Sequence, residues 1–172
     1  MCQFLSCIVL RNGDLLWDPY TDSHEELIGA YDLDDSKEPS INRFVRVEYK
    51  PGDFKDYDNP KEYILKVDES QTPSWFEEVK EAVEGKLQAI IKRIILKDVN
   101  KKCLLSGVYI LTGKTEIKYL VNTRIFMMSG TSKVGVMRGT SKVGEMWETS
   151  KVGVMWGTSK EVIGKDYRQP IS

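Results

Sequence analysis

The first part of the chain alternates apolar and polar residues in short runs that are typical of β-strands. The apolar run Phe4–Leu10 is followed by Asn12-Gly13 and then by Leu15–Trp17. Because Asn-Gly fits a two-residue type I′ turn, in which both central residues need positive φ, we expect a hairpin over about residues 3–17. Two more strands are predicted by alternating runs, namely Phe44–Tyr49 and Glu62–Asp68.

Between these strands, one short segment has the pattern of a helix start. Asp22-Ser23-His24-Glu25 has the form of a capping box, with Asp22 accepting a hydrogen bond from the backbone and Glu25 reaching back. The pattern predicts a short helix over about residues 23–30, with Leu27 and Ile28 facing inward.

A longer helix is predicted from Ser74 onward. Pro73 suits a first helical turn, and Ser74 with Glu77 forms a second capping box. Apolar residues then follow at three-and-four spacing along one face: Phe76, Val79, Val83, Leu87, Ile90, Ile91, Ile94 and Ile95. We therefore expect an α+β domain, in which an antiparallel sheet packs against one long amphipathic helix.

A nine-residue repeat begins near Val121. The copies read VNTRIFMMS, GTSKVGVMR, GTSKVGEMW, ETSKVGVMW and the degraded GTSKEVIGK, and Lys114–Leu120 resembles a decayed copy displaced by eight residues. Four residue types recur at fixed places: Thr131, Thr140, Thr149 and Thr158; Lys133, Lys142, Lys151 and Lys160; Val134, Val143 and Val152; Met128, Met137, Met146 and Met155. Such self-similarity predicts stacked units.

Nine residues accommodate one turn and one short strand, so the repeat predicts a short β-solenoid, or β-roll, with two units in each coil. Val and Met are expected inward, Thr and Ser in the turns, and Lys outward. Predicted strands 103–111 and 115–120 would start the stack, and either the tail 166–172 or another chain would cover its far end. The expected domains are residues 1–102 and residues 103–172.

Several segments also carry a family resemblance. The opening Met1–Phe4, the stretch Pro19–Ile28, the segment Ile110–Thr115 and the nonapeptides resemble an uncharacterised family of phage and gut-metagenome proteins. Those proteins look like a small N-terminal domain followed by a variable number of repeats. The resemblance covers nearly the whole chain and implies a phage or mobile-element protein in a bacterial cytoplasm. Small phage proteins of this kind often antagonise host defence, which the resemblance then implies here.

Charge is divided unevenly along the chain. Residues 1–102 hold 15 Lys and Arg against 21 Asp and Glu, whereas residues 103–172 hold 10 against 5. The asymmetry can draw an anionic ligand to the second part, or it can hold the two parts or two molecules together, and we favour the latter interpretation. No segment approaches the roughly 18 apolar residues that span a membrane, and no signal peptide is expected, which favours a cytoplasmic protein.

Candidate catalytic groups are few. The odd number of cysteines, Cys2, Cys7 and Cys103, fits neither a zinc site nor a disulfide framework. Cys2 would be an N-terminal nucleophile if the initiator Met is removed, although a buried or strand-borne thiol is the favoured interpretation. His24, the one histidine, is a candidate base or metal ligand, or simply a first-turn residue beside a cap. We expect no metal, because one histidine without a second cluster of ligands does not make a zinc site. We also expect no cofactor, and Gly113-Lys114-Thr115 copies only the end of a phosphate-binding loop, without the preceding glycine spacing.

The candidate ligand-binding residues lie in the repeat: Lys133, Lys142, Lys151, Lys160, Arg138, Trp147 and Trp156. On a two-sided roll, Lys133 and Lys151 would share one side, and Lys142 and Lys160 the other. Such rows beside tryptophans can bind phosphates and stack bases. The favoured alternative is that Lys protects a strand edge from aggregation while Trp covers the stack.

Three functional hypotheses follow. The first is a non-enzymatic, homo-oligomeric phage protein that inhibits or sequesters a host component, either a defence protein or an anionic nucleotide second messenger. The second is a structural or oligomerisation module, in which the solenoid spaces or assembles the N-terminal domain. The third is a small thiol hydrolase that uses Cys2. Neither a membrane nor duplex nucleic acid is an expected partner.

Overall fold

A computed structural model describes residues 5–35 and 43–161 of the chain. The chain divides into two compact units, Met1–Lys92 and Arg93–Ser172. Within the described residues, neither helix combines the length and the apolar character that crossing a membrane requires.

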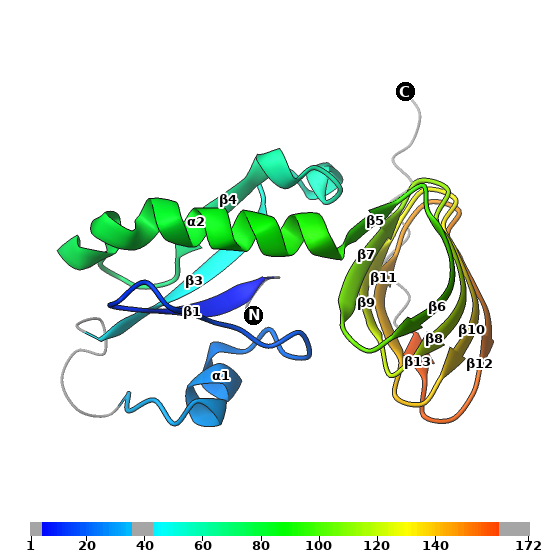
Figure 1. Cartoon of the computed structure of the whole chain (residues 1–172), viewed down its shortest axis with the longest axis horizontal. Helices are drawn as coiled ribbons and strands as arrows, with labels where there is room; N and C mark the ends of the chain where they lie inside the picture. Colours follow the sequence, from blue (N-terminus) through cyan, green and yellow to red (C-terminus); the bar gives the residue numbers. More distant parts are fainter. Residues whose placement is uncertain (1–4, 36–42, 162–172) are drawn as a thin grey trace. The chain divides into compact units, whose positions relative to one another are not determined.

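The first unit is built on an antiparallel sheet with strand order β2-β1-β3-β4 (Figure 1). Its strands are β1 (Ser6–Leu10), β2 (Leu15–Leu16), β3 (Phe44–Pro51) and β4 (Tyr63–Val67). The segment before β4 contains two short 3-10 helices, η2 (Phe54–Asp56) and η3 (Pro60–Glu62). The antiparallel sheet expected from the alternating runs is therefore confirmed.

The hairpin between β1 and β2 has a longer loop than the Asn-Gly pattern predicts. The amide of Leu10 donates to the carbonyl oxygen of Asp14 at 2.9 Å, so three residues form the loop. Gly13 has φ +81°, whereas Asn12 is not among the described residues with positive φ. The type I′ prediction is wrong because Asn12 uses its side chain instead: its Oδ1 accepts from the Asp14 amide at 3.0 Å. A turn followed by a left-handed glycine also matches the strand twist.

The short helix α1 (His24–Ala30) is present, but its cap is not the predicted one. Ser23 is the N-cap, and its Oγ accepts a hydrogen bond from the Glu26 amide at 3.2 Å. The prediction of Asp22 as the cap is wrong by one residue, because the helix begins at His24 and the residue before it, Ser23, caps the Glu26 amide. Leu27 is fully buried against Ile8 and Phe44, as expected.

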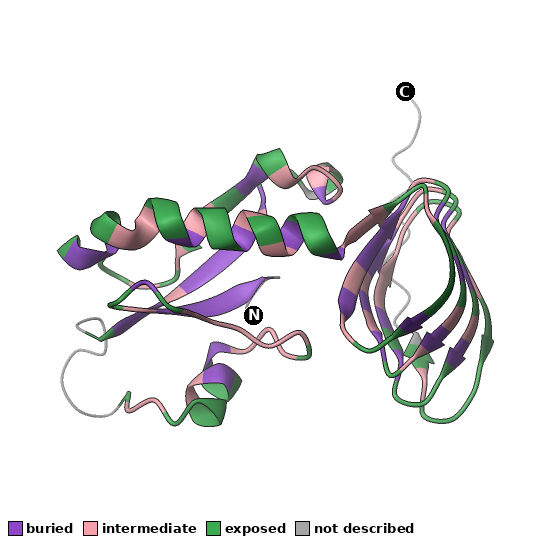
Figure 2. Cartoon of the chain, in the orientation of Figure 1, coloured by how far each residue is buried: buried purple, intermediate pink, exposed green. Residues whose placement is uncertain are grey.

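The long helix α2 (Ser74–Ile94) begins at the predicted residue. Its three-and-four pattern is reproduced as a buried face that includes Phe76, Val83, Leu87 and Ile91 (Figure 2). In the first unit it covers the sheet: the Nζ of Lys86 donates to the carbonyl oxygen of Gly13 at 2.8 Å. Helix and sheet thereby enclose the core of the unit.

The second unit is a β-solenoid of about four coils, made of two parallel sheets (Figure 1). One sheet has the order β12-β10-β8-β6 and the other β13-β11-β9-β7-β5. The strands are β5 (Ile95–Lys97), β6 (Asn100–Leu105), β7 (Val108–Thr112), β8 (Glu116–Val121), β9 (Arg124–Met128), β10 (Lys133–Arg138), β11 (Lys142–Met146), β12 (Lys151–Met155) and β13 (Lys160–Glu161). Successive strands alternate between the sheets, so two nine-residue units complete one coil.

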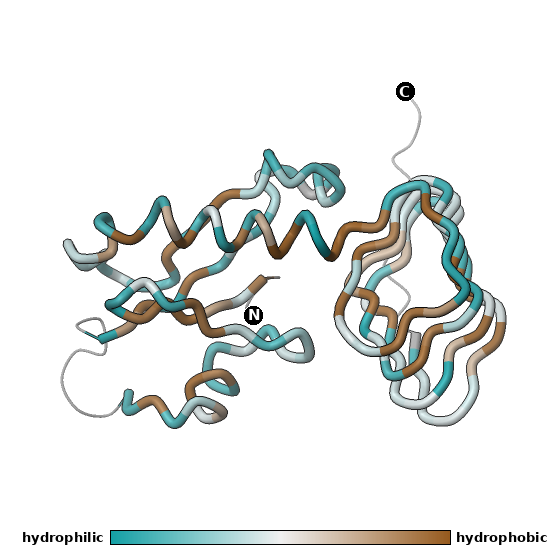
Figure 3. Tube along the Cα trace, in the orientation of Figure 1, coloured by the Kyte–Doolittle hydropathy of each residue, from teal (hydrophilic) through white to brown (hydrophobic). Residues whose placement is uncertain are grey.

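Ladders of equivalent residues run through the stack as predicted. Lys133 pairs with Lys151, Val134 with Val152, and Met137 with Met155, each pair being eighteen residues apart. The valines and methionines line one inner cluster in which Val134 and Met137 are buried, and apolar segments recur at corresponding places in successive coils (Figure 3). The four repeated lysines are exposed.

The solenoid starts earlier than the repeat. Strands β5 and β6 begin before residue 103, where the sequence predicted the domain boundary. The predicted strand 103–111 is divided between β6 and β7, because Ser106 and Gly107 form a turn with φ values of 70° and 89°. The decayed copy is confirmed, since Ile117 in β8 pairs with Val134, seventeen residues away.

Candidate anion-binding edge of the solenoid

The turns of the solenoid form two edges. We call the first the basic edge; it consists of the turns that lead from the four-stranded to the five-stranded sheet, at residues 105–108, 121–124, 138–142 and 156–160. We call the second the mixed edge; it consists of the return turns, at residues 97–100, 112–116, 129–133 and 147–151. Every repeated lysine lies where a turn meets the next strand, so the two edges share the lysines equally.

The two edges differ in charge. The basic edge contains four cations, Arg124, Arg138, Lys142 and Lys160, and its turns contain no Asp or Glu. The mixed edge also contains four cations, Lys97, Lys114, Lys133 and Lys151, but it includes three acids, Asp98, Glu116 and Glu148. Stacking therefore concentrates positive charge on one side of the solenoid and balances most of it on the other.

Three cations of the basic edge stand in register on neighbouring strands. Arg124 pairs with Lys142, and Lys142 with Lys160, at the starts of β9, β11 and β13. Neighbouring strands lie about 4.8 Å apart, and like charges placed directly opposite repel one another. Among the described residues, Lys142, Lys160 and Arg138 form no ion pair. Lys142 and Lys160 therefore hold positive charge that a bound anion would neutralise.

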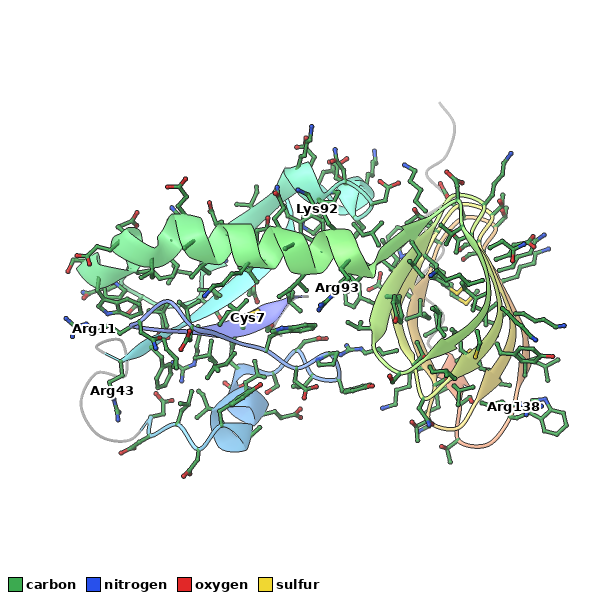
Figure 4. All side chains as sticks on the ribbon, viewed as in Figure 1. Cys7, Arg11, Arg43, Lys92, Arg93 and Arg138 are labelled. Atoms are coloured by element: carbon green, nitrogen blue, oxygen red, sulfur yellow. The ribbon has the colours of Figure 1, made fainter. Side chains whose placement is uncertain are left out.

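Arg138 and Trp156 border this row on the other side of the turns. Arg138 ends β10, where it pairs with Val121, and Figure 4 shows its side chain pointing out from the margin of the solenoid. Trp156 follows β12 one coil later: its amide donates to the carbonyl oxygen of Met137 at 2.9 Å, and it is 61% exposed. The exposed Trp156 thus follows Arg138 by eighteen residues, at the equivalent place in the next coil, and lies close to Lys160 in sequence.

Hydrogen bonds within the turns hold the basic edge in shape. Ser141 Oγ donates to the carbonyl oxygen of Arg138 at 2.7 Å, and Ser159 Oγ makes the equivalent bond to Trp156 at 2.7 Å. The amide of Thr140 donates to Oδ1 of Asn122 at 3.1 Å, which ties one turn to the turn of the coil below. Because these bonds fix the backbone, the basic side chains project from a rigid support.

The mixed edge neutralises part of its own charge. Lys133 Nζ lies 3.3 Å from Glu116 Oε1, and the carboxylate of Glu148 accepts a hydrogen bond from the Gly130 amide. Trp147 lies at this edge and is half-buried, and its Nε1 donates to Glu145 Oε2 at 3.0 Å. The predicted separation of the lysines into two rows is confirmed, and the two tryptophans of the candidate set are placed on different edges.

The catalytic candidates of the first unit do not form a site within the described residues. Cys2 lies outside those residues, so the thiol-hydrolase hypothesis stays a prediction. His24 is buried, with Nε2 3.1 Å from the Val47 carbonyl oxygen and Nδ1 3.4 Å from Asp68 Oδ2. Cys7 is also buried, and burial raises the pKa of its thiol. The described residues contain no group of three or more His, Cys, Asp or Glu side chains that could hold a metal ion.

One member of the basic edge was missed by sequence reasoning. Arg124 occupies the lysine position of its copy, as its pairing with Lys142 shows. The sequence of that copy, VNTRIFMMS, differs from the later copies at most other positions. The alignment of Ile125 with the repeated valines was the signal that would have placed it. Comparison of the chain with family models, with curated proteins and with solved structures finds no match.

Proposed function

We propose that this chain is a non-catalytic binding protein that captures an anionic, nucleotide-like ligand at the basic edge. The observation that carries the proposal is the in-register row Arg124, Lys142 and Lys160, bordered by Arg138, on an edge whose turns contain no acidic residue. A phosphate placed against this row would form charge-assisted hydrogen bonds, which are stronger than neutral ones. Arginine adds bidentate geometry, whereas lysine acts as a point charge.

Trp156 indicates a second feature of the proposed ligand, an aromatic base. An exposed indole beside a basic row can stack a nucleobase, and such stacking contributes about 1–3 kcal/mol per base. The position of Trp156 one coil from Arg138 also allows a cation–π contribution to that platform. We therefore propose a ligand that combines phosphate with an aromatic base, rather than phosphate alone.

The repeat supplies a matched pair of variants for the test. Lys142→Glu with Lys160→Glu reverses two charges on the basic edge, and Lys133→Glu with Lys151→Glu makes the same change on the mixed edge. Calorimetry with mononucleotides, cyclic dinucleotides and tripolyphosphate should show binding that weakens as salt rises. We expect the first variant to lose affinity by about tenfold or more, and the second to stay within about threefold.

Two outcomes would overturn the proposal. One is the absence of binding by every compound in the panel, and the other is an equal loss in both double variants, since a general effect of net charge would explain it. Trp156→Ala tests the base: it should weaken nucleotide binding and leave tripolyphosphate binding unchanged.

The biological setting is a further part of the proposal. We propose, from the resemblance to phage proteins, that the ligand is a nucleotide signal of a bacterial host and that binding sequesters it. Native mass spectrometry of the chain purified from bacterial cells should then show a bound nucleotide mass, which disappears in the Lys142→Glu, Lys160→Glu variant. Retention of that mass by the variant would contradict the assignment to the basic edge.

A further inference from the structure

The C-terminal end of the solenoid leaves apolar residues uncovered. Strand β12 repeats the sequence KVGVM of β10, and the two strands pair in register. Met137 in β10 is fully buried, whereas Met155, its equivalent in β12, is 47% exposed. Val154, on the same strand, is 48% exposed. The end coil thus has the composition of a covered coil without a covering strand in the described part of the chain.

The free edge of β12 is also available for backbone pairing. In the four-stranded sheet, β12 is the terminal strand, and within the described residues only β10 pairs with it. Strand edges of this kind pair readily with another strand, and proteins usually protect them with charge, proline or a covering segment. Here the edge consists of Val152-Gly153-Val154-Met155 between one lysine and one tryptophan.

We propose that β12 pairs antiparallel with β12 of a second copy of the chain, about a two-fold axis between Gly153 and Val154. The inward and outward positions of the strand support this register. Val152 packs against the inner cluster and Met155 is in register with the buried Met137, so 152 and 155 face inward. In the two-fold pairing, Val152 lies opposite the partner's Met155, and Gly153 opposite the partner's Val154. Residues on the same side of the sheet therefore meet.

Charge favours the same arrangement. Antiparallel pairing places Lys151 opposite the partner's Trp156, which is a cation–π contact instead of the lysine pair that parallel pairing creates between Lys133 and Lys151. The two-fold axis also closes the assembly, because both copies contribute the same β12 edge to one shared contact. In this register the partner's Lys151 adds a cation beside the basic edge, although the dimer itself requires no ligand.

Head-to-tail stacking and coverage by the chain's own tail fit less well. A parallel contact with β6 of another copy would place Val152 against the partner's Lys101, since Lys101 pairs with Ile117 and Ile117 with Val134 in the same ladder. For the tail, the positions eighteen residues after Lys151–Val154 are Gln169–Ser172, which bring Pro170 opposite Val152. Proline has no N–H to donate to a ladder and is disfavoured within a sheet.

The test uses the full chain without ligand. Sedimentation velocity should show a dimer, and Val154→Lys should convert it to a monomer, whereas Val136→Lys, at the same place in the preceding coil, should leave it dimeric. Both variants should keep the circular dichroism spectrum of the parent chain. A monomeric parent chain, which coverage by the tail would produce, or an open series of larger oligomers, which head-to-tail stacking would produce, would each overturn the proposal.

The register is tested by cross-linking. In a Cys103→Ser background, Val154→Cys should form a disulfide between the two copies on mild oxidation, because the two side chains flank the two-fold axis. Val136→Cys should not form one. A dimer in which Val154→Cys stays reduced, or in which both variants cross-link equally, would show that another surface holds the copies together. Because neither experiment contains a nucleotide, failure here leaves the anion-binding proposal to its own test.

Discussion

The Nζ of Lys133 lies 3.3 Å from Oε1 of Glu116, although the two residues are seventeen positions apart and belong to different coils. The pair stands at the mixed edge, whereas Arg138, Lys142 and Lys160 of the basic edge form no such pair among the described residues. Both side chains are more than half exposed, so the pair contributes little to stability. Its consequence is electrostatic, because Glu116 lowers the net positive charge of the mixed edge and the turns of the basic edge contain no acid.

Removing the acids of the mixed edge should therefore create a second basic edge. In Glu116→Gln with Glu148→Gln, we expect tripolyphosphate to bind at about two sites per chain instead of one, as isothermal titration calorimetry would report, because local charge concentrates an anion. Glu77→Gln with Glu78→Gln, which makes the same charge change on the exposed face of α2, should leave the stoichiometry unchanged. A second site in both variants, or in neither, would contradict this account of the edges.

The glycine in the middle of each repeat is required by the approach of the next coil. A Cβ on Gly135 would stand 2.7 Å from the carbonyl oxygen of Lys118, which is backbone and cannot move aside. We expect Gly135→Ala to lower the free energy of unfolding by about 1–3 kcal/mol, as overpacking usually does. Gly85→Ala in α2 is the matched control: its Cβ meets nothing within 4 Å, and it should stabilise the helix by about 1 kcal/mol. Urea denaturation of both variants measures the difference.

The copy that begins at Glu148 departs from the glycine pattern at its turn. Glu148 has φ +57° where the other copies have Gly130, Gly139 and Gly157, and the left-handed region costs a residue with a Cβ about 1–2 kcal/mol. Glu148→Gly should raise the free energy of unfolding by about 0.5–1 kcal/mol. The gain is smaller than the full conformational cost because the variant loses the hydrogen bond that Glu148 accepts from the Gly130 amide. Thermal unfolding of this variant should shift upward.

The reverse change provides the control for this turn. Gly139 has φ +65°, and a Cβ there would lie 2.1 Å from Oδ1 of Asn122, so Gly139→Glu should lower the melting temperature. Equal melting temperatures for Glu148→Gly, Gly139→Glu and the parent chain would show that backbone conformation does not limit the stability of these turns.

The solenoid could be predicted from the sequence because the same residue types, at a fixed spacing, make the same contacts in successive coils. Val134, Val143 and Val152 face the same interior at a spacing of nine, so one periodicity encodes both strand and register. The first coil could not be recognised in this way. There, β6 pairs with β8 through the backbone ladder, and Leu104 opposite Leu120 is its buried apolar position, while its exposed positions do not repeat the residue types of the later coils.

The charge of the edges could be predicted only in part. The separation of Lys133 and Lys151 from Lys142 and Lys160 follows from counting two units per coil. The net charge of each edge depends instead on which distant turns stack, and the decayed copy that carries Glu116 is offset by seventeen residues rather than eighteen. The local pattern also failed where two neighbouring residues are both good caps: the N-cap of α1 is Ser23 and not Asp22.

His24 should be a structural residue of the first unit. Its ring is buried at 1% exposure, and its two nitrogens face the carbonyl oxygen of Val47 and the carboxylate of Asp68. His24→Ala removes these contacts and leaves a cavity, so we expect a loss of about 2–4 kcal/mol in the free energy of unfolding. Asp68→Asn should cost less, because the Asp68 side chain is 46% exposed. Guanidinium denaturation that places His24→Ala within error of the parent chain would refute this role.

The two described cysteines should differ in reactivity, because Cys7 is fully buried and Cys103 is exposed. Burial raises the pKa of the Cys7 thiol far above its ordinary value, so the folded protein contains almost no thiolate at this position. Iodoacetamide at mildly alkaline pH should modify Cys103 and spare Cys7 until denaturant is added, as peptide mapping by mass spectrometry would show. Modification of both at the same rate in the folded protein would mean that the sheet opens around β1.

The same burial predicts how stability changes with pH. Because the pKa of Cys7 is higher in the folded state, its neutral thiol stabilises folding fully below about pH 8.5, the ordinary pKa of an unfolded cysteine. As the pH rises above that value, the unfolded chain ionises first, so this contribution is lost. Cys7→Val removes the titrating group and should flatten the alkaline part of the stability curve, measured by urea denaturation between pH 7 and about 10. Cys103→Val, at an exposed position, should leave that slope as it is in the parent chain.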